Sequence, residues 1–278
     1  IIGSSGMAGH MIKNVLVRTH DFNIYDIARN EQYGKVSHQF DVTDFEKLKT
    51  TLINLKPHYV INCVGVLNMR AEEHPANAIL INSYLPHFLA EICTKLNLRL
   101  IHISTDCVFS GKKGDYIEKD FKDGKGIYAQ SKSLGEVENR DHLTIRTSII
   151  GPELKKNGIG LFDWFLKQEK EIRGYSNVFW SGVTTLQLAK SILHLIKNGK
   201  ISGIFHLSNN TKISKYELLL LMKKGFRDKD DIKVVQDNTF RWDKSLINTN
   251  TTLGLTSSYE QMLVELKEWM LDLDNETN

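Results

Sequence analysis

Short aliphatic runs alternate with stretches of helical periodicity through the first half of the chain. Strands are predicted at residues 22–29, 58–66, 98–109 and 142–151. Helices are predicted at residues 43–55, where Thr43 or Asp44 is placed as the cap, and at residues 77–97. This order is typical of a parallel sheet covered by helices on both faces. We therefore predict an α/β fold with a doubly wound parallel sheet.

The pattern loosens after Gly151. Helices are predicted at residues 158–168, 184–199, 214–226 and 257–273, and a short strand at residues 203–209. Ser214 and Glu217 have the spacing of a capping box at the start of one of these helices. We predict a first domain over residues 1–150 and a smaller lobe over residues 151–278, some segments of which return to the first domain. Ligands bind at the carboxyl ends of the strands in such sheets, so the lobe would close over that edge.

Composition excludes several classes of protein. The 278 residues are 41% hydrophobic, and 36 Lys and Arg against 33 Asp and Glu lie scattered along the chain, which disfavours a nucleic-acid partner. Three cysteines without C-x-x-C spacing argue against a disulfide framework or zinc site and indicate a reducing, cytoplasmic protein. No run approaches the roughly 18 apolar residues of a membrane span, so we predict no membrane association.

Three glycines begin the first predicted helix, in the stretch "IIGSSGMAG". A glycine inside a helix costs about 1 kcal/mol relative to alanine, so Gly3, Gly6 and Gly9 indicate that something approaches the backbone there. A helix N-terminus attracts anions, and phosphate is the obvious candidate. The spacing G-x-x-G-x-x-G differs from the usual dinucleotide fingerprint, and a purely structural turn stays an alternative. The strand, helix and strand order around it favours a dinucleotide site.

A second set of residues carries proton chemistry. Tyr128 and Lys132 lie four apart in "GIYAQSKSLGE" and share a helix face, where the ammonium would lower the pKa of the phenol. Ser104 and Thr105 follow a buried strand, and a hydroxyl there can hydrogen-bond the same substrate oxygen as the tyrosine. Each signal is common alone, but the order of glycine turn, hydroxyl and Tyr-x-x-x-Lys is specific.

At this point the sequence resembles the extended short-chain dehydrogenase/reductases, and most closely the dTDP-4-dehydrorhamnose reductase family. The resemblance rests on "GSSGMAG", "DVTD", "VINCVGV", "ISTDCVFSG", "YAQSKSLGE", "IRTSIIG" and "GIFHLSNNTKISKYEL", which span nearly the whole chain. It implies a Rossmann-type sheet with a C-terminal substrate-binding lobe. It also implies NAD(P)H-dependent reduction of the 4-keto group of a nucleotide-linked 4-keto-6-deoxy sugar, for the synthesis of cell-surface polysaccharide precursors.

The resemblance also implies residue roles. Tyr128 would be the general acid, Lys132 would hold the nicotinamide ribose, and Thr105 would orient the carbonyl. Asp106 and Trp180 are predicted to contact the sugar, although Trp180 is as well explained as a core aromatic. The predicted cofactor-binding residues, besides Tyr128 and Lys132, are Gly3, Ser5, Gly6, Met7, Ala8, Gly9, Arg29, Asp41, Val42, Cys63, Val64 and Gly65.

The end of the strand predicted at residues 22–29 bears on cofactor choice. Arg29 stands where an arginine can pair with the extra phosphate of NADP, whereas a carboxylate there accepts the ribose hydroxyls of NAD. The Asp26 carboxylate leaves NAD as an alternative cofactor, but Asp26 lies three residues before the position of Arg29. We therefore predict NADP(H) in preference to NAD(H).

Two departures from the family pattern limit the prediction. Some family members dimerise through magnesium held partly by the first helix, but "HMIKNVL" carries no carboxylate here, so we predict no metal and leave a homodimer possible. Ile149 stands where many rhamnose enzymes have tryptophan, so a UDP-linked N-acetylated 4-keto sugar remains an alternative substrate.

Two other functions on the same scaffold stay open. One is a non-catalytic, dinucleotide-binding regulatory subunit like the β subunit of methionine adenosyltransferase. The other is a 4,6-dehydratase or epimerase, although dehydratases follow the Ser-Thr pair with Asp-Glu, and Asp106 precedes Cys107 here.

Overall fold

A parallel sheet forms the centre of the molecule, which is described from a computed structural model over residues 1–155, 158–199, 201–227, 232–250 and 256–277. Its strands are β1 (Ile27–Ala28), β2 (His38–Gln39), β3 (Tyr59–Asn62), β4 (Arg99–Ile103), β5 (Leu143–Arg146) and β9 (Gly203–His206). Ile2 bridges to both Ile27 and Asn62, so the spatial order is β2, β1, Ile2, β3, β4, β5, β9. The order reverses between β1 and β3, which is the signature of the doubly wound fold. The predicted fold class is confirmed.

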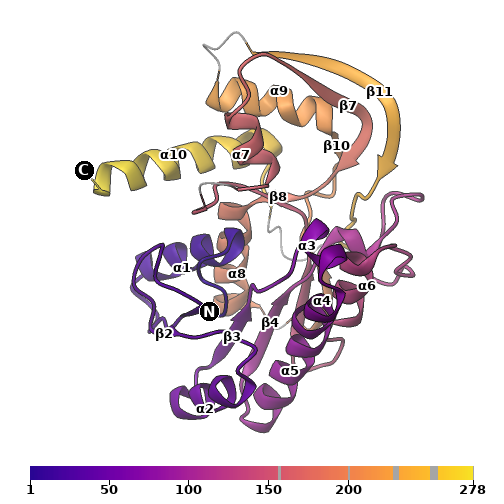
Figure 1. The fold of residues 1–278 in the computed structure, drawn as a ribbon. Coiled ribbons are helices and arrows are strands. Elements are labelled where there is room, and N and C mark those ends of the chain that lie inside the picture. The colour runs from indigo at the N-terminus through magenta and orange to yellow at the C-terminus, as the bar shows by residue number, and fades with distance from the viewer. Residues whose placement is uncertain (156–157, 200, 228–231, 251–255, 278) are drawn as a thin grey trace.

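Helices cover both faces of this sheet (Figure 1). On one face, α1 (Met7–Arg18) and α8 (Thr185–Asn198) pack on the core that contains Ile61, Ile101 and Ile145. On the other, α2 (Phe45–Leu55) and α5 (Leu85–Lys95) pack on Val60 and Leu100. The side chains of successive residues in a strand point to opposite faces, which places Val60 and Ile61 in different cores.

A second, smaller sheet lies above the first in Figure 1. It has the order β10 (Ile213–Ser214), β7 (Glu171–Trp180), β11 (Lys233–Asp243), with β11 parallel and β10 antiparallel to β7. Alongside it lie α7 (Leu161–Leu166), α9 (Lys215–Phe226) and α10 (Tyr259–Thr277), and β6 (Ile149–Ile150) pairs with β8 (Val183–Thr184) nearby. Within residues 151–278, β9 and α8 return to the central sheet. The long strands β7 and β11 were not predicted.

The helix predicted at residues 77–97 is interrupted. It is divided into α4 (Pro75–Ala78), a π-helical turn η1 (Ile79–Tyr84) and α5. At the π turn, the fully buried Asn82 side chain accepts from Val66 N at 2.8 Å and donates to Val66 O and to the Ser131 hydroxyl. The irregular turn thereby joins the loop after β3, which continues into α3 (Asn68–Glu73), to α6 (Ile127–Leu134).

The predicted caps agree with the structure. Asp44 accepts from Lys47 N at the start of α2, and Ser214 and Glu217 form the complete capping box of α9. Within the described residues, no helix has both the length and the apolar character needed to cross a membrane.

Candidate active site

The glycine turn after Ile2 forms one wall of a cavity at the N-terminus of α1. Gly3 has φ +85°, and a Cβ there would lie 2.8 Å from the Val64 side chain. Gly9 supports the turn from below, because a Cβ on it would overlap the Gly3 carbonyl. At Gly6 a Cβ would meet only Gly3 O, at 3.4 Å, so a side chain would project into the cavity. The glycines therefore leave room for a ligand against the helix terminus.

This cavity of about 290 Å³ lies where the strand order reverses, the expected place for a dinucleotide. Nine predicted cofactor residues line it: Gly3, Ser5, Gly6, Arg29, Asp41, Val42, Cys63, Val64 and Gly65. Met7, Ala8 and Gly9 belong to α1, and the Met7 methyl lies towards Gly160. Asn77 and Lys155 also line the cavity, and sequence reasoning missed both because no local pattern marks them.

Asp26 is already engaged within the protein. It is 2% exposed, and its carboxylate binds Lys13 Nζ at 2.8 Å and both the N–H and hydroxyl of Ser37 at 2.9 and 3.0 Å. Burial opposes its ionisation, but the hydrogen bonds from Lys13 and its serine neighbours outweigh burial and hold its pKa at about 2. Arg29, by contrast, is exposed at the end of β1 and lines the cavity.

The residues predicted to take part in proton transfer meet at the carboxyl end of β4. Thr105 follows the strand, and its hydroxyl lies close enough to the Tyr128 phenol to lower the pKa of that phenol. Helix α6 is aimed by Glu72, whose carboxylate accepts from Ile127 N at 2.8 Å. Burial raises the pKa of Tyr128, so the phenol keeps its proton at neutral pH. The arrangement suits a general acid.

Lys132 lies one turn further along α6 and is 4% exposed. Its ammonium donates to Ile103 O at 2.7 Å, and burial lowers its pKa to about 8. The lowering of the Tyr128 pKa expected from Lys132 is not found. Burial raises this pKa, and the group that opposes the effect is the nearby Thr105 hydroxyl, not Lys132. Lys132 faces the side of the glycine turn, since its charge acts on Cys63, whose pKa is raised by burial to about 12.

A larger cavity of about 940 Å³ opens on the other side of Tyr128. Cys107 and Phe109 line it near the catalytic residues, and Trp242 and Lys244 line it from β11 and the residue after it. Asp106 is buried behind Cys107, where its carboxylate accepts from the Thr105 hydroxyl at 3.1 Å.

Trp180 lies in the core of the second lobe. It is 3% exposed, its ring centroid is 5.7 Å from that of Tyr259, and Lys215 lies over its ring at 5.2 Å. Its neighbour Phe179 lines the larger cavity instead. A sugar contact by Trp180 stays a prediction, and its position favours the alternative of a core aromatic.

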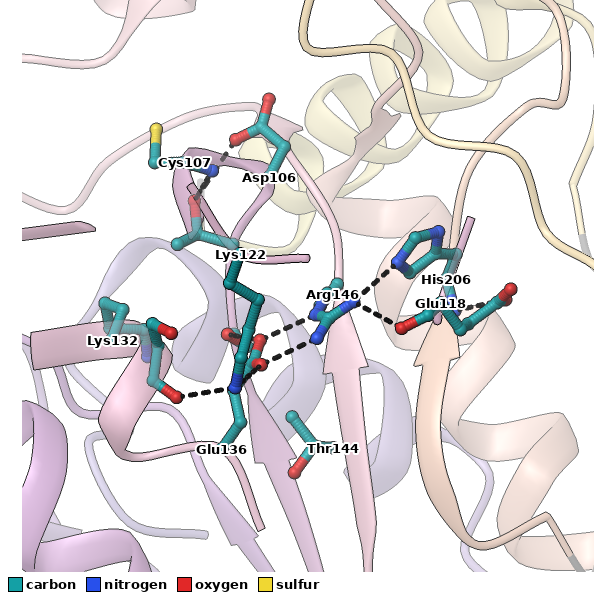
Figure 2. A network of polar contacts seen from close by, with 12 residues as sticks. Asp106, Cys107, Glu118, Lys122, Lys132, Glu136, Thr144, Arg146 and His206 are labelled. Carbon is teal, nitrogen blue, oxygen red and sulfur yellow. Dashed lines mark hydrogen bonds and ion pairs between the residues drawn. The ribbon is translucent and has the colours of Figure 1, made fainter. Parts of the chain in front are cut away.

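A buried ion-pair network supports α6 from the sheet (Figure 2). Arg146 on β5 makes two hydrogen bonds of 2.8 Å to Glu136, which follows Lys132 by four residues. Glu136 also binds Lys122 at 3.1 Å and the Ser104 hydroxyl at 2.7 Å. Burial opposes the ionisation of Glu136, but Arg146 lowers its pKa enough to keep it charged. Sequence reasoning did not find this network, because charged residues are rarely buried.

The opposite edge of Arg146 reaches β9. Its guanidinium donates to Glu118 O at 3.0 Å and to His206 Nε2 at 3.2 Å, as Figure 2 shows. His206 Nδ1 lies 3.0 Å from Ile247 O, and burial lowers the pKa of His206 to about 4. The neutral ring therefore accepts from Arg146 and donates to Ile247, which links the catalytic helix to the segment after β11.

Among the residues that the structure describes, no three His, Cys, Asp or Glu side chains gather as metal ligands would.

A doubly wound sheet with a glycine turn at its first strand, and with Thr105, Tyr128 and Lys132 near the carboxyl end of β4, is the arrangement expected of an extended short-chain dehydrogenase/reductase. Over residues 1–275 the chain matches the family described as "RmlD substrate binding domain", and it belongs to that family.

Several known proteins are similar to this chain. The spore coat polysaccharide biosynthesis protein SpsK of Bacillus subtilis is 30% identical over 183 residues, which cover 64% of each of the two chains. The dTDP-4-keto-6-deoxy-D-glucose reductase of Streptomyces niveus is 26% identical over 225 residues, or 78% of this chain and 75% of that protein.

Two further similarities bear on fold and function. The crystal structure of dTDP-4-dehydrorhamnose reductase from Bacillus anthracis in complex with NADP has the same fold, with a TM-score of 0.79, 22% identity and coverage of 95% of this chain and 96% of that one. Methionine adenosyltransferase 2 subunit beta of Xenopus laevis is 25% identical over 213 residues, or 70% of this chain and 63% of that protein.

Proposed function

We propose that this protein reduces the 4-keto group of a nucleotide-linked 4-keto-6-deoxy sugar with NAD(P)H. The observation that carries the proposal is the position of Tyr128: it lines the 940 Å³ cavity, lies near Thr105 and is on the same helix as Lys132. A relative that is a dTDP-4-keto-6-deoxy-D-glucose reductase supports the substrate class.

Thr105, Tyr128 and Lys132 have different roles in the proposed reaction. When bound, the cofactor supplies hydride to the ketone carbon. The Thr105 hydroxyl donates to the Asp106 carboxylate in this structure. On substrate binding it would donate to the ketone oxygen instead and so orient that oxygen towards Tyr128. Tyr128 gives its proton to that oxygen as negative charge develops there, and its raised pKa ensures that the proton is present at the start. Lys132 remains an ammonium below its pKa of about 8, and it would hold the ribose hydroxyls of the cofactor.

We further propose that NADP(H) is preferred to NAD(H). The Asp26 carboxylate is occupied by Lys13 and Ser37, so it is a poor acceptor for ribose hydroxyls. Arg29 lines the cofactor cavity and supplies the cation that an extra phosphate needs. Solved structures of the same fold hold NADP in one case and NAD in others, so the preference rests on Arg29 and Asp26.

The regulatory function is the second candidate, because subunit beta of methionine adenosyltransferase is also similar to this chain. The complete set of Thr105, Tyr128 and Lys132 favours catalysis. The free thiols of Cys63, Cys93 and Cys107 support a cytoplasmic enzyme.

Oxidation of NADPH with a panel of dTDP- and UDP-linked 4-keto-6-deoxy sugars tests the proposed function. We expect turnover with one of the two nucleotide classes. Binding of NADPH without turnover of any member of the panel would favour the regulatory candidate.

A further inference from the structure

The outer part of the larger cavity contains a rigidly held aromatic ring. Trp242 near the end of β11 is 50% exposed, yet its indole N–H donates to Ser110 O. The ring also lies against Gly111, which has φ +81° and where a Cβ would overlap the indole. Asp243 N donates to Gly111 O at 2.9 Å and fixes the strand to the same turn. The exposed surface of the indole is therefore held in place in the wall of the cavity.

Cations line the cavity in which this ring lies. Arg241, Lys244 and Lys112 line the same cavity, and within the described residues no carboxylate forms an ion pair with any of them. The acidic residues of the wall are partly occupied: Asp243 pairs with Lys212 at 2.8 Å, and Glu72 accepts from the backbone of α6. The cavity therefore offers free positive charge beside an aromatic surface.

Lys244 connects the two ends of the cavity. Its ammonium lies 6.0 Å from the centre of the Trp242 ring, and it is also close enough to act electrostatically on the Cys107 thiol beside the catalytic residues. The order from the reacting end outward is thus Tyr128 and Cys107, then a cation, then an indole. A nucleotide sugar has the same order of ketone, diphosphate and base.

We propose that Trp242 is the platform on which the pyrimidine base of the substrate stacks, and that Lys244 and Arg241 bind its diphosphate. This inference rests on the proposed function and locates the nucleotide end of that site. Stacking on an indole accepts either thymine or uracil, because both bases present a flat π face. Trp242 would therefore bind pyrimidine bases in general, and other contacts would discriminate between dTDP and UDP.

Calorimetric titration of the purified protein with free dTDP and free UDP tests the inference, because binding is measured without turnover. Trp242→Ala should weaken binding of the preferred nucleotide by about tenfold or more, the usual loss when an aromatic platform is truncated. Trp242→Phe keeps an aromatic ring but lacks the indole N–H. Its nucleotide affinity should lie within roughly a few-fold of the wild-type affinity, because the base can still stack on the ring. Lys244→Met should also weaken binding.

Phe240→Ala is the matched control. Phe240 lies on the same strand, is 55% exposed and packs on Tyr175, but it does not line the cavity, so its removal should leave nucleotide affinity unchanged. Equal affinities of the wild type and Trp242→Ala, with NADPH binding intact in both, would overturn the platform while leaving the proposed function standing. A wild type that binds neither dTDP nor UDP would overturn both.

Discussion

Asp26 and Arg29 lie three residues apart at the end of the strand predicted at residues 22–29. Their surroundings differ, and we expect only Arg29 to contact the cofactor. Asp26 is buried against Lys13 and Ser37, whereas Arg29 is exposed in the wall of the cofactor cavity. Removing Arg29 takes away a cation that would face the extra phosphate of NADP. Arg29→Ala should therefore weaken NADPH binding by about ten- to a hundredfold, the worth of one charge-assisted hydrogen bond.

NADH affinity is the internal control for this variant and should change little. Both cofactors should be titrated at low salt, because screening would weaken an exposed contact. An equal loss for the two cofactors would mean that Arg29 only supports the fold, and a wild type that prefers NADH would contradict the proposed preference.

We expect Lys132 to make cofactor binding depend on pH. Burial lowers its pKa to about 8, so its side chain is charged below that pH and neutral above it. We expect NADPH affinity to be constant in the neutral range and to fall as the pH rises through about 8. Lys132→Met should bind weakly and lose this pH dependence, whereas Tyr128→Phe should retain it. A native affinity that stays constant from pH 7 to pH 9, roughly one unit either side of that pKa, would contradict the role of the ammonium.

At the scale of the element, α6 illustrates what the sequence could and could not predict. The spacing of Tyr128 and Lys132 is a local property of one helix, so the sequence predicts that the two side chains share a helix face. The support of that helix by Glu136 and Arg146 is not local, since it depends on where β5 lies beneath α6. Lys155 reaches the cofactor cavity from the second half of the chain for a similar reason.

The ion pair beneath α6 should be costly to break. Glu136→Gln leaves the guanidinium of Arg146, 2% exposed, without its counter-charge, and we expect a loss of about 3–5 kcal/mol in the free energy of unfolding. Urea denaturation measures this loss. The Glu136 contribution should be full near neutral pH and decline as the pH falls, because its folded pKa lies below its ordinary value.

Glu138→Gln is the control for this prediction. Glu138 is exposed, and its substitution removes the same charge two positions away from Glu136. Similar free energies of unfolding for the two variants would show that the buried ion pair contributes no more to stability than an exposed negative charge does.

At the scale of the whole molecule, the parallel sheet was predictable and the smaller sheet was not. Val60 and Leu100 belong to buried strands with continuous apolar runs, which sequence reasoning detects. β7 and β11 are largely half-exposed or exposed along their lengths, and they pair with each other about sixty residues apart in sequence. Their stability comes from a distant partner, so neither segment carries a strong local signal.

Assembly should not depend on a divalent metal. The first helix carries no carboxylate, and we expect EDTA to leave both activity and the light-scattering mass unchanged. Dissociation of a dimer on chelation would contradict this prediction and point to acidic ligands elsewhere in the chain.

The proposed function depends above all on Tyr128 as the proton donor to the sugar ketone. The direct measurement is single-turnover reduction of a nucleotide-linked 4-keto-6-deoxy sugar by Tyr128→Phe and by the wild type, with NADPH binding measured in parallel. The variant should bind NADPH as the wild type does and lose most of its turnover, by about a hundredfold or more, as loss of a general acid predicts. Reduction by the variant at the native rate would show that the proton comes from another group.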